Sequence, residues 1–198
     1  MSRMWCRAMV AALSIYSAVI HHAVAADVRA EGGRACEREM ARAARIHGIP
    51  LGILYAVGLT ETGRRGALYP YALGAEGQTV FAKNMADAMA SFEAMRHRGV
   101  RLIDLGCMQI NHYYHGDKFE SVQAMFNPAR NVDYAARFLK ELKQREGSWT
   151  MAVARYNAGP NNNPAQKRYV CHIVDHLVSS GFGAWTDKAR SFCQLGTT

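Results

Sequence analysis

Glu61 is the residue whose chemical type and spacing first indicate acid–base chemistry. It follows Leu54 by seven residues and Gly58 by three, so a helix would place its carboxyl group on an apolar face. Burial on that face and the negative end of the helix dipole would both raise its pKa above the usual value of roughly 4.3. A carboxyl group that keeps its proton near neutral pH can act as a general acid. Periodicity leaves one alternative open, a frayed last turn with Glu61 in solvent.

Four short motifs follow one another along the chain. They are Glu61-Thr62-Gly63, Gly106-Cys107-Met108-Gln109-Ile110-Asn111, Tyr156-Asn157-Ala158-Gly159-Pro160 and Tyr169-Val170. In order and rough spacing they strongly resemble the lytic transglycosylases with a lysozyme-like fold, over about residues 36–180. The stretch "IDLGCMQIN" looks most like the small, single-domain members that serve secretion systems, conjugation, pili or flagella.

The resemblance implies a mechanism in which one carboxyl group acts twice. In this family the glutamate that matches Glu61 protonates the glycosidic oxygen between N-acetylmuramic acid and N-acetylglucosamine. Its carboxylate then takes the proton of the muramoyl 6-hydroxyl, and a 1,6-anhydro ring closes without water. The internal hydroxyl has a large effective concentration as a nucleophile. We expect no metal and no organic cofactor, because acid and base work on one carboxylate needs neither.

The same resemblance implies a substrate-binding cleft around Glu61. Residues 106–111 would form one wall, because uncharged residues suit a neutral sugar. Methionine offers a flat, polarisable contact to a sugar face, glutamine offers an amide for hydroxyl or N-acetyl groups, and asparagine could steady an oxocarbenium-like transition state. Tyr169 would direct its hydroxyl toward Glu61, whereas we expect Tyr156 to pack in the core. The implied substrate-binding residues are Met108, Gln109, Asn157 and Tyr169.

Two departures from the family pattern affect this interpretation. Many members have serine after the catalytic glutamate and a second serine in a downstream hairpin. Here Thr62 follows Glu61, and residues 66–82 contain no serine, so neither of the family's serines has an identical match in this chain. Cys107 stands where leucine is commoner, and a cysteine there can act as a small buried apolar residue or join a disulfide.

Two other functions are compatible with the same residues. A muramidase that hydrolyses this bond would need a second carboxylate or a base that activates water. Glu76, Asp87 and Asp104 are available, and Asp104 is nearest in sequence to the cleft segment. We nevertheless expect Asp104 to cap a turn through backbone N–H groups. A non-catalytic protein that binds cell wall is the third reading, and the presence of Glu61 argues against it.

Helical periodicity dominates the chain and predicts an α+β, mostly α, lysozyme-like single domain with a helical core. Residues 64–82 are rich in Gly, Pro, Tyr and Val, so they suit a small β-hairpin or irregular lobe and are the one candidate for sheet. A stripe of apolar residues within 84–98 predicts a core-facing helix, with an exposed methionine groove for a partner as the alternative. The predicted helices cover about 36–47, 50–63, 84–98, 128–147, 149–157 and 164–179.

The first residues have the pattern of a secretory signal. Residues 1–25 run from a basic start through an apolar stretch to Ala23-Val24-Ala25, a small-x-small cleavage form. An uncut membrane anchor is the alternative, but the apolar run is short for a bilayer span. We therefore predict a signal peptide at 1–25, a linker at 26–34, a catalytic domain at 35–198 and a periplasmic location.

Four cysteines remain after the predicted signal. An even number in a chain bound for an oxidising compartment predicts two disulfides. Three pairings are possible, and because chain ends often lie close together we favour Cys36 with Cys193 and Cys107 with Cys171. A zinc site is disfavoured, since the chain has no CxxC and no HExxH motif.

The net charge of the chain is +8, which favours an anionic partner. Loss of Arg3 and Arg7 with the signal would leave 22 basic and 16 acidic residues, a formal charge of +6. The basic residues are dispersed along predicted helices, so nucleic acid is disfavoured and an anionic cell wall fits better. A solvated basic face that only aids solubility is the alternative. Examples of this dispersion are Arg130, Arg137, Lys140 and Lys143.

Overall fold

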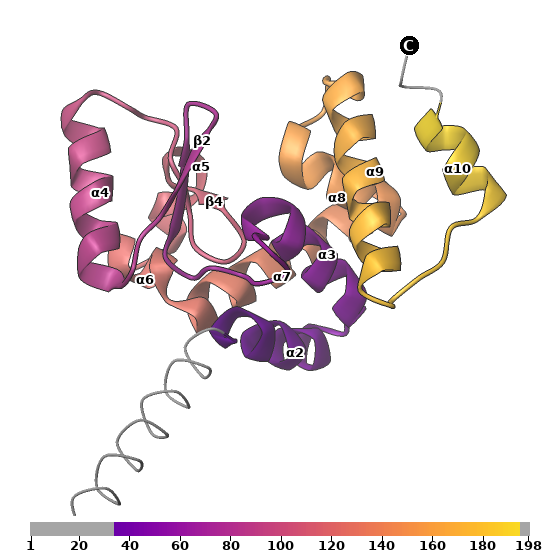
Figure 1. Ribbon diagram of the computed structural model, residues 1–198, viewed down its shortest axis with the longest axis horizontal. Coiled ribbons are helices and arrows are strands. Elements are labelled where there is room, and N and C mark those ends of the chain that lie inside the picture. The colour runs from indigo at the N-terminus through magenta and orange to yellow at the C-terminus, as the bar shows by residue number, and fades with distance from the viewer. Residues whose placement is uncertain (1–33, 195–198) are drawn as a thin grey trace, which may run out of the picture. The chain divides into compact units, whose positions relative to one another are not determined.

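The computed structural model describes residues 34–194 (Figure 1). The described residues from Ala35 onward form one compact unit. The predicted signal peptide and all of the predicted linker except Arg34 lie outside the described residues. Within the described part of the chain, no helix is long and apolar enough to cross a membrane.

The predicted fold class, mostly α with a small β lobe, is confirmed. The first half contains α2 (Ala35–His47), α3 (Leu51–Thr62), β1 (Ala72–Ala75), β2 (Gln78–Phe81), α4 (Met85–His97), β3 (Asp104–Leu105) and β4 (Ile110–Asn111). The second half contains α5 (His112–His115), a 3-10 turn (Gly116–Lys118), α6 (Val122–Phe126), α7 (Pro128–Glu146), α8 (Trp149–Ala158), α9 (Asn163–Ser179) and α10 (Asp187–Gln194).

Helix α3 crosses the middle of the domain and carries Glu61 in its last turn (Figure 1). It packs against α2 and α9, and its apolar side chains are buried around most of its circumference. Gly58 permits the approach of α2, because a Cβ at this position would lie 2.3 Å from the Met40 Cε atom. The carboxyl group of Glu61 is therefore held by a helix that the core fixes on several sides.

Helix α7 is the longest helix of the described residues, and it begins and ends close to the residues that its sequence predicts. The Asn127 side chain accepts a hydrogen bond from the Arg130 backbone N–H, and Pro128 occupies the first turn. Gly147 ends the helix in the left-handed conformation. Its buried face contacts α2 and α8 and contains Val132, Ala135, Ala136 and Leu139.

The sheet extends beyond the predicted hairpin. Strands β1 and β2 form that hairpin, but β3 and β4 add to it in the antiparallel order β2-β1-β3-β4. The expectation that residues 64–82 were the one candidate for sheet was therefore wrong. Strands of two residues have no periodicity that a sequence can display. Residues 106–109 form the β3–β4 turn, and Gly106 has a φ of +79° there, a conformation that favours glycine.

The predicted apolar stripe of α4 belongs to the core. Phe92 and Met95 are buried, and Met85 and Met89 are partly buried against the same cluster. The alternative of an exposed methionine groove is therefore not supported. Helix α4 flanks the sheet, and its side chains connect the small lobe to α6.

The two disulfides differ from the favoured pairing. Cys36 of α2 is bonded to Cys107 in the β3–β4 turn, and Cys171 of α9 is bonded to Cys193 of α10. The favoured pairs, Cys36 with Cys193 and Cys107 with Cys171, were wrong. Proximity of the chain ends did not decide the pairing, because α2 packs against α3 and reaches the β3–β4 turn, where Cys107 lies. Cys36 and Cys107 are completely buried.

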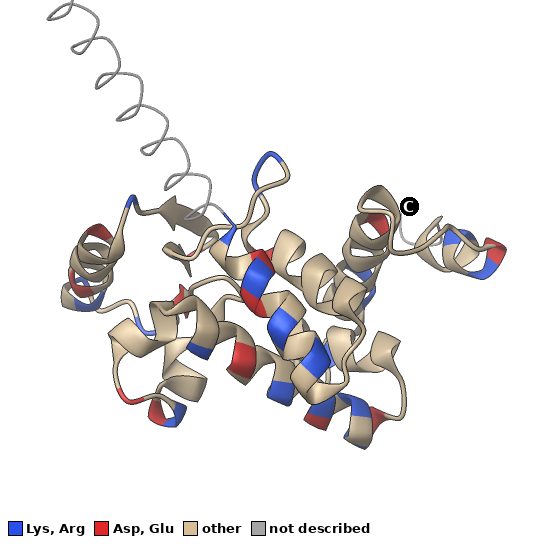
Figure 2. Cartoon of the chain, turned by 90° about the horizontal axis from the view of Figure 1, so that it is seen from below, with Lys and Arg blue, Asp and Glu red and all other residues tan. Residues whose placement is uncertain are grey.

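Basic residues are spread over several helices and alternate with acidic ones (Figure 2). Two of the residues cited from the sequence form ion pairs, Arg130 with Glu120 at 3.0 Å and Arg137 with Asp133 at 3.1 Å. Lys140 instead donates to the backbone carbonyl of His47 at 2.8 Å, which joins α7 to α2. These basic groups thus serve local contacts on the helical side of the domain.

Candidate active site

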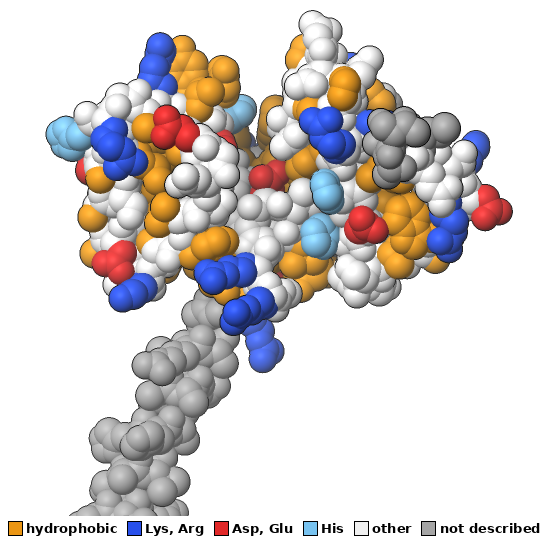
Figure 3. Space-filling model, turned by 45° about the horizontal axis from the view of Figure 1, so that its top comes forward, with side chains coloured by type: hydrophobic (Ala, Val, Ile, Leu, Met, Phe, Trp, Pro, Cys, Tyr) orange, Lys and Arg blue, Asp and Glu red, His pale blue; other side chains and the backbone are white. Residues whose placement is uncertain are grey.

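A cavity of about 220 Å³ lies where α3, the β3–β4 turn and α8 meet. The face drawn in Figure 3 is hollowed between the sheet side and the side formed by α8 and α9. The lining combines two carboxyl groups with neutral polar and aromatic side chains, which suits an uncharged polar ligand. The lining residues are Glu61, Asp104, Gln109, Ile110, Asn111, His115, Phe138, Tyr156 and Asn157.

Glu61 has an unusual electrostatic environment at the floor of this cavity. The pKa of Glu61 is raised from 4.5 to about 7, chiefly by burial and with a smaller contribution from the nearby Asp104 carboxylate. The Tyr169 hydroxyl donates a hydrogen bond of 2.6 Å to Glu61 Oε1, which opposes the rise. The pKa of Tyr169 itself is raised well above 10, so its hydroxyl keeps the proton that it donates. Glu61 can thus exchange a proton near neutral pH.

Replacement of Tyr169 by phenylalanine is expected to shift the pH dependence of catalysis upward. A carboxyl group can act as a general acid only while it is protonated, so if Glu61 has the role that the family resemblance implies, kcat/KM should fall as the pH rises through about 7. The Tyr169 hydroxyl stabilises the carboxylate form, and without it the pKa of Glu61 should rise. The pH profile of kcat/KM on purified peptidoglycan measures this alkaline limb, and an unchanged or lower limb in Tyr169→Phe would contradict the assignment.

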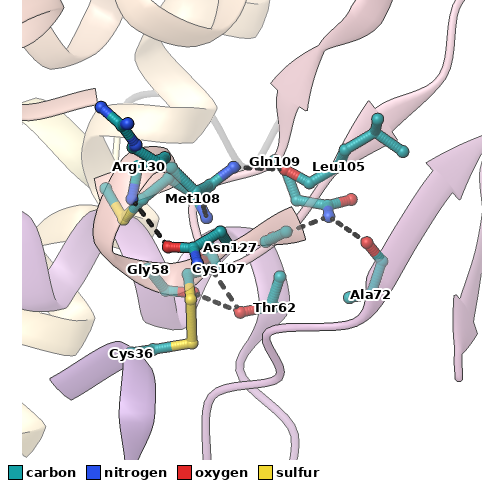
Figure 4. The surroundings of a disulfide bond; sticks show 12 residues. Cys36, Gly58, Thr62, Ala72, Leu105, Cys107, Met108, Gln109, Asn127 and Arg130 are labelled. Atoms are coloured by element: carbon teal, nitrogen blue, oxygen red, sulfur yellow. Dashed lines mark hydrogen bonds between the residues drawn. A yellow bond between two sulfur atoms is a disulfide. The ribbon is translucent and has the colours of Figure 1, made fainter. Parts of the chain in front are cut away.

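The β3–β4 turn lines the same cavity as Glu61 through Gln109, and Figure 4 shows the groups that hold this turn in place. The Cys36–Cys107 disulfide anchors it to α2, and the Thr62 hydroxyl donates to the Cys107 carbonyl at 3.2 Å. Asn131 of α7 accepts from the Met108 N–H at 2.8 Å and donates to the carbonyls of Leu105 and Met125. The Thr62 hydroxyl therefore supports the cleft wall through a hydrogen bond that a serine hydroxyl could also donate.

Gln109 and Met108 differ in what they present to the cavity. Gln109 lines it, has a φ of +46°, and donates its side-chain amide to the backbone carbonyls of Ala72 and Gly106. The amide nitrogen thus braces the turn, and Oε1 is the part left for a ligand. Met108 is completely buried, so the predicted contact of its side chain with a sugar face is not supported. Its backbone carbonyl accepts from Tyr156 at 2.7 Å.

Asn157 and Tyr156 form the opposite wall from the end of α8. Both line the cavity, whereas the sequence interpretation had placed Tyr156 only in core packing. Tyr156 also packs against Phe138 of α7, with ring centroids 5.8 Å apart. The same side chain therefore lines the cavity and packs against a neighbouring helix. The segment after Asn157 is fixed by Arg155, which donates to the Gly159 carbonyl at 3.2 Å.

Asp104 is the one of the three alternative carboxylates that lies in the cavity. Glu76 is at the β1–β2 turn and Asp87 is in the first turn of α4. We expected Asp104 to accept backbone N–H groups, but the hydrogen bond that it accepts comes from the Asn111 side chain at 2.8 Å. Burial raises the pKa of Asp104, and Asn111 opposes this rise.

The structure brings together Glu61, Gln109, Asn157 and Asp104 as cavity-lining residues, with Tyr169 behind Glu61. Sequence reasoning missed His115 and Phe138, which reach the cavity from α5 and α7. Ile110 and Asn111 also line the cavity, and their adjacency to Gln109 in the sequence could have indicated this. No comparable signal marked Phe138, because an aromatic residue on a helix face is usually core.

Known protein families provide an independent comparison. Residues 41–173 match the family model described as Transglycosylase SLT domain. No curated protein and no solved structure matches the chain. The matched range covers more than half of the chain and contains Glu61, the β3–β4 turn, Asn157 and Tyr169.

Proposed function

The chain belongs to the Transglycosylase SLT domain family of peptidoglycan lytic transglycosylases, and from this premise we propose that it forms 1,6-anhydromuramoyl ends with Glu61 as its catalytic residue. The observation that carries the proposal is a carboxyl group with a pKa of about 7 that lines a cavity and has one hydrogen-bond donor, Tyr169. Such a group can give up a proton and later accept one at the same pH.

The proposed reaction proceeds in two proton transfers at Glu61. The protonated carboxyl group donates to the glycosidic oxygen, the bond from that oxygen to C1 of N-acetylmuramic acid breaks, and N-acetylglucosamine leaves with a 4-hydroxyl group. The carboxylate then removes the proton of the muramoyl 6-hydroxyl as this oxygen bonds to C1. Glu61 ends protonated, as it began. Between the two transfers, the Tyr169 hydrogen bond stabilises the carboxylate.

The neutral polar side chains support a glycan in this cavity. Asn157 and Gln109 both line it, so the Asn157 amide and the Gln109 Oε1 atom are the groups available to a ligand. The N-acetyl groups of the glycan carry one N–H and one carbonyl each, which match the acceptors and donors of side-chain amides. We assign both residues to substrate binding, with Asn157 beside the sugar that develops positive charge.

Hydrolysis of the same bond is the second candidate function, and the position of Asp104 favours it. Asp104 shares the cavity with Glu61, so it could serve as the second carboxylate or the base of a muramidase. The two reactions differ in the nucleophile that reaches C1, which is the muramoyl 6-hydroxyl in one and water in the other.

Mass spectrometry of the released muropeptides tests the proposed function. Purified peptidoglycan treated with the protein is expected to yield anhydromuramoyl ends, which are lighter than hydrolysed ends by one water molecule. A Glu61→Gln sample treated in parallel is the control and should release none. Reducing muramic acid ends would contradict the anhydro product and would make Asp104 the next residue to replace.

We also propose that the protein acts in the periplasm and opens peptidoglycan locally for an envelope-spanning machine. The signal pattern of residues 1–25 and the resemblance of "IDLGCMQIN" to secretion, conjugation, pilus and flagellar members support this role. Two disulfides are compatible with an oxidising compartment. Fractionation of cells expressing the full chain tests the location, and an unprocessed chain in the cytoplasm would contradict it.

A further inference from the structure

His115 lines the same cavity as Glu61 and has no part in the reaction described above. It is the last residue of α5, the short helix that follows the β3–β4 turn and strand β4. The Asn111 side chain caps the start of this helix by accepting from the N–H groups of Tyr113 and Tyr114. The backbone that carries His115 is therefore fixed to the strand that follows Gln109.

Tyr134 of α7 fixes the orientation of the His115 ring. The Tyr134 hydroxyl and His115 Nδ1 are 2.8 Å apart, and the two ring centroids are separated by 5.6 Å. The ring also packs against Phe138, with centroids 5.1 Å apart. Nδ1 is thus occupied on the α7 side. Nε2 lies on the far side of the imidazole and is the nitrogen left for a ligand in the cavity.

The charge state of His115 suits a neutral ligand. Burial lowers the pKa of His115 below 6.5, and the positive charge of Lys118 acts in the same direction, while Asp117 opposes both. A neutral imidazole has one N–H group, and the contact with Tyr134 is compatible with either tautomer. In the tautomer whose Nδ1 accepts from the Tyr134 hydroxyl, that N–H is on Nε2. The ring then offers a donor without bringing a positive charge into the cavity.

We propose that His115 is a substrate-binding residue, oriented by Tyr134, whose Nε2–H donates a hydrogen bond to an acceptor oxygen of the bound glycan. The inference rests on the proposed function, because the glycan is the substrate of that function. The acceptor is a neutral oxygen, either a hydroxyl or an acetamido carbonyl. His115 and Asn157 then contact the glycan from the small lobe and from α8 respectively.

Two replacements of His115 separate substrate binding from a purely structural role. Asparagine can place an amide near the Nδ1 position, so His115→Asn keeps a partner for Tyr134 and loses the donor toward the cavity. Glutamine reaches the Nε2 position, so His115→Gln keeps that donor and loses the partner of Tyr134. A purely structural histidine would show the opposite order of effects.

Glycan binding is measured in the full chain with Glu61→Gln, which prevents turnover. The probe is an oligomer of β-1,4-linked N-acetylglucosamine, titrated by calorimetry. His115→Asn is expected to weaken binding by about 3- to 10-fold, the effect of one lost neutral hydrogen bond, and His115→Gln to weaken it less. His112→Asn is the matched control on the same helix, because His112 is not among the lining residues, and it should bind as the parent does.

The outcomes distinguish the two proposals. Parent-like affinity in His115→Asn, or a larger loss in His115→Gln, would overturn the role of His115 while the proposed function stands. Absence of oligomer binding by the Glu61→Gln parent would overturn this inference, whereas the proposed function would be overturned by the muropeptide products alone. Thermal melting of each variant shows whether it is folded, and Tyr134→Phe provides a further check. That variant should weaken binding with His115 present and have no added effect in His115→Asn.

Discussion

Glu61→Gln is expected to lower kcat/KM for peptidoglycan cleavage by about three to four orders of magnitude. Glutamine has nearly the same shape as glutamic acid but cannot give a proton to the glycosidic oxygen or take one from the 6-hydroxyl. General acid–base catalysis by one group typically accounts for factors of about 10² to 10⁴, and here the same group serves both steps. Release of soluble muropeptides from purified peptidoglycan, measured over time, provides the rate.

The loss of activity should not come from unfolding. In the folded chain the pKa of Glu61 is about 7, above the usual 4.5, so the folded state binds a proton that the unfolded state releases between these pH values. Stability contributed by this group is present below about pH 4.5 and is lost as the pH rises through 7. Glutamine removes this loss, so Glu61→Gln should have a higher free energy of unfolding than the parent above pH 7.

Glu93→Gln is the matched control for the activity test of Glu61→Gln. Glu93 is exposed on α4 and does not line the cavity, so Glu93→Gln should retain the parent rate. If Glu61→Gln kept a tenth or more of the parent rate while folded, Glu61 could not be the proton donor. A different carboxyl group, with Asp104 as the first candidate, would then have to supply the acid.

The six longer helices could be predicted because their signals are local, whereas the shorter α5, α6 and α10 were not predicted. Periodicity placed Glu61 at the end of α3 but left its burial open. A mostly apolar run between Pro50 and Gly63 identifies α3, which is buried around most of its circumference, and Asn127, Pro128 and Gly147 mark the ends of α7. The hydrogen bond from Tyr169 to Glu61 joins residues separated by 108 positions, and it was expected only through the family resemblance. Composition and periodicity carry no information about such a pair.

The parts that could not be predicted depend on contacts between distant segments. Met108 belongs to a neutral, sulfur-containing segment that suggests a sugar-binding surface, yet the turn directs its side chain into the core and exposes Gln109 instead. A left-handed φ at Gln109 produces this orientation, and a glutamine in the sequence does not signal one. His115 reaches the cavity only because α5 packs against α7.

The disulfide between Cys36 and Cys107 is expected to contribute about 4 kcal/mol to the free energy of unfolding. It closes a loop with a sequence separation of 71, and chain-entropy arguments give roughly this value for such a loop. We expect Cys36→Ala with Cys107→Ala to lower the urea midpoint accordingly. Activity should fall as well, since the turn that carries Gln109 loses its covalent link to α2 and is then held by hydrogen bonds, among them those to Asn131, Thr62 and Tyr156.

The second disulfide is a control for this prediction within the same chain. Cys171 and Cys193 are separated by 22 residues, so the loop-entropy contribution is smaller, about 3 kcal/mol at most. Helix α10 has no buried residues and packs mainly on α9, so its release leaves the cavity intact. Cys171→Ala with Cys193→Ala should therefore lower stability less and leave kcat/KM near the parent value. Equal losses of activity in the two double variants would mean that the Cys36–Cys107 bond stabilises the fold without positioning the cleft wall.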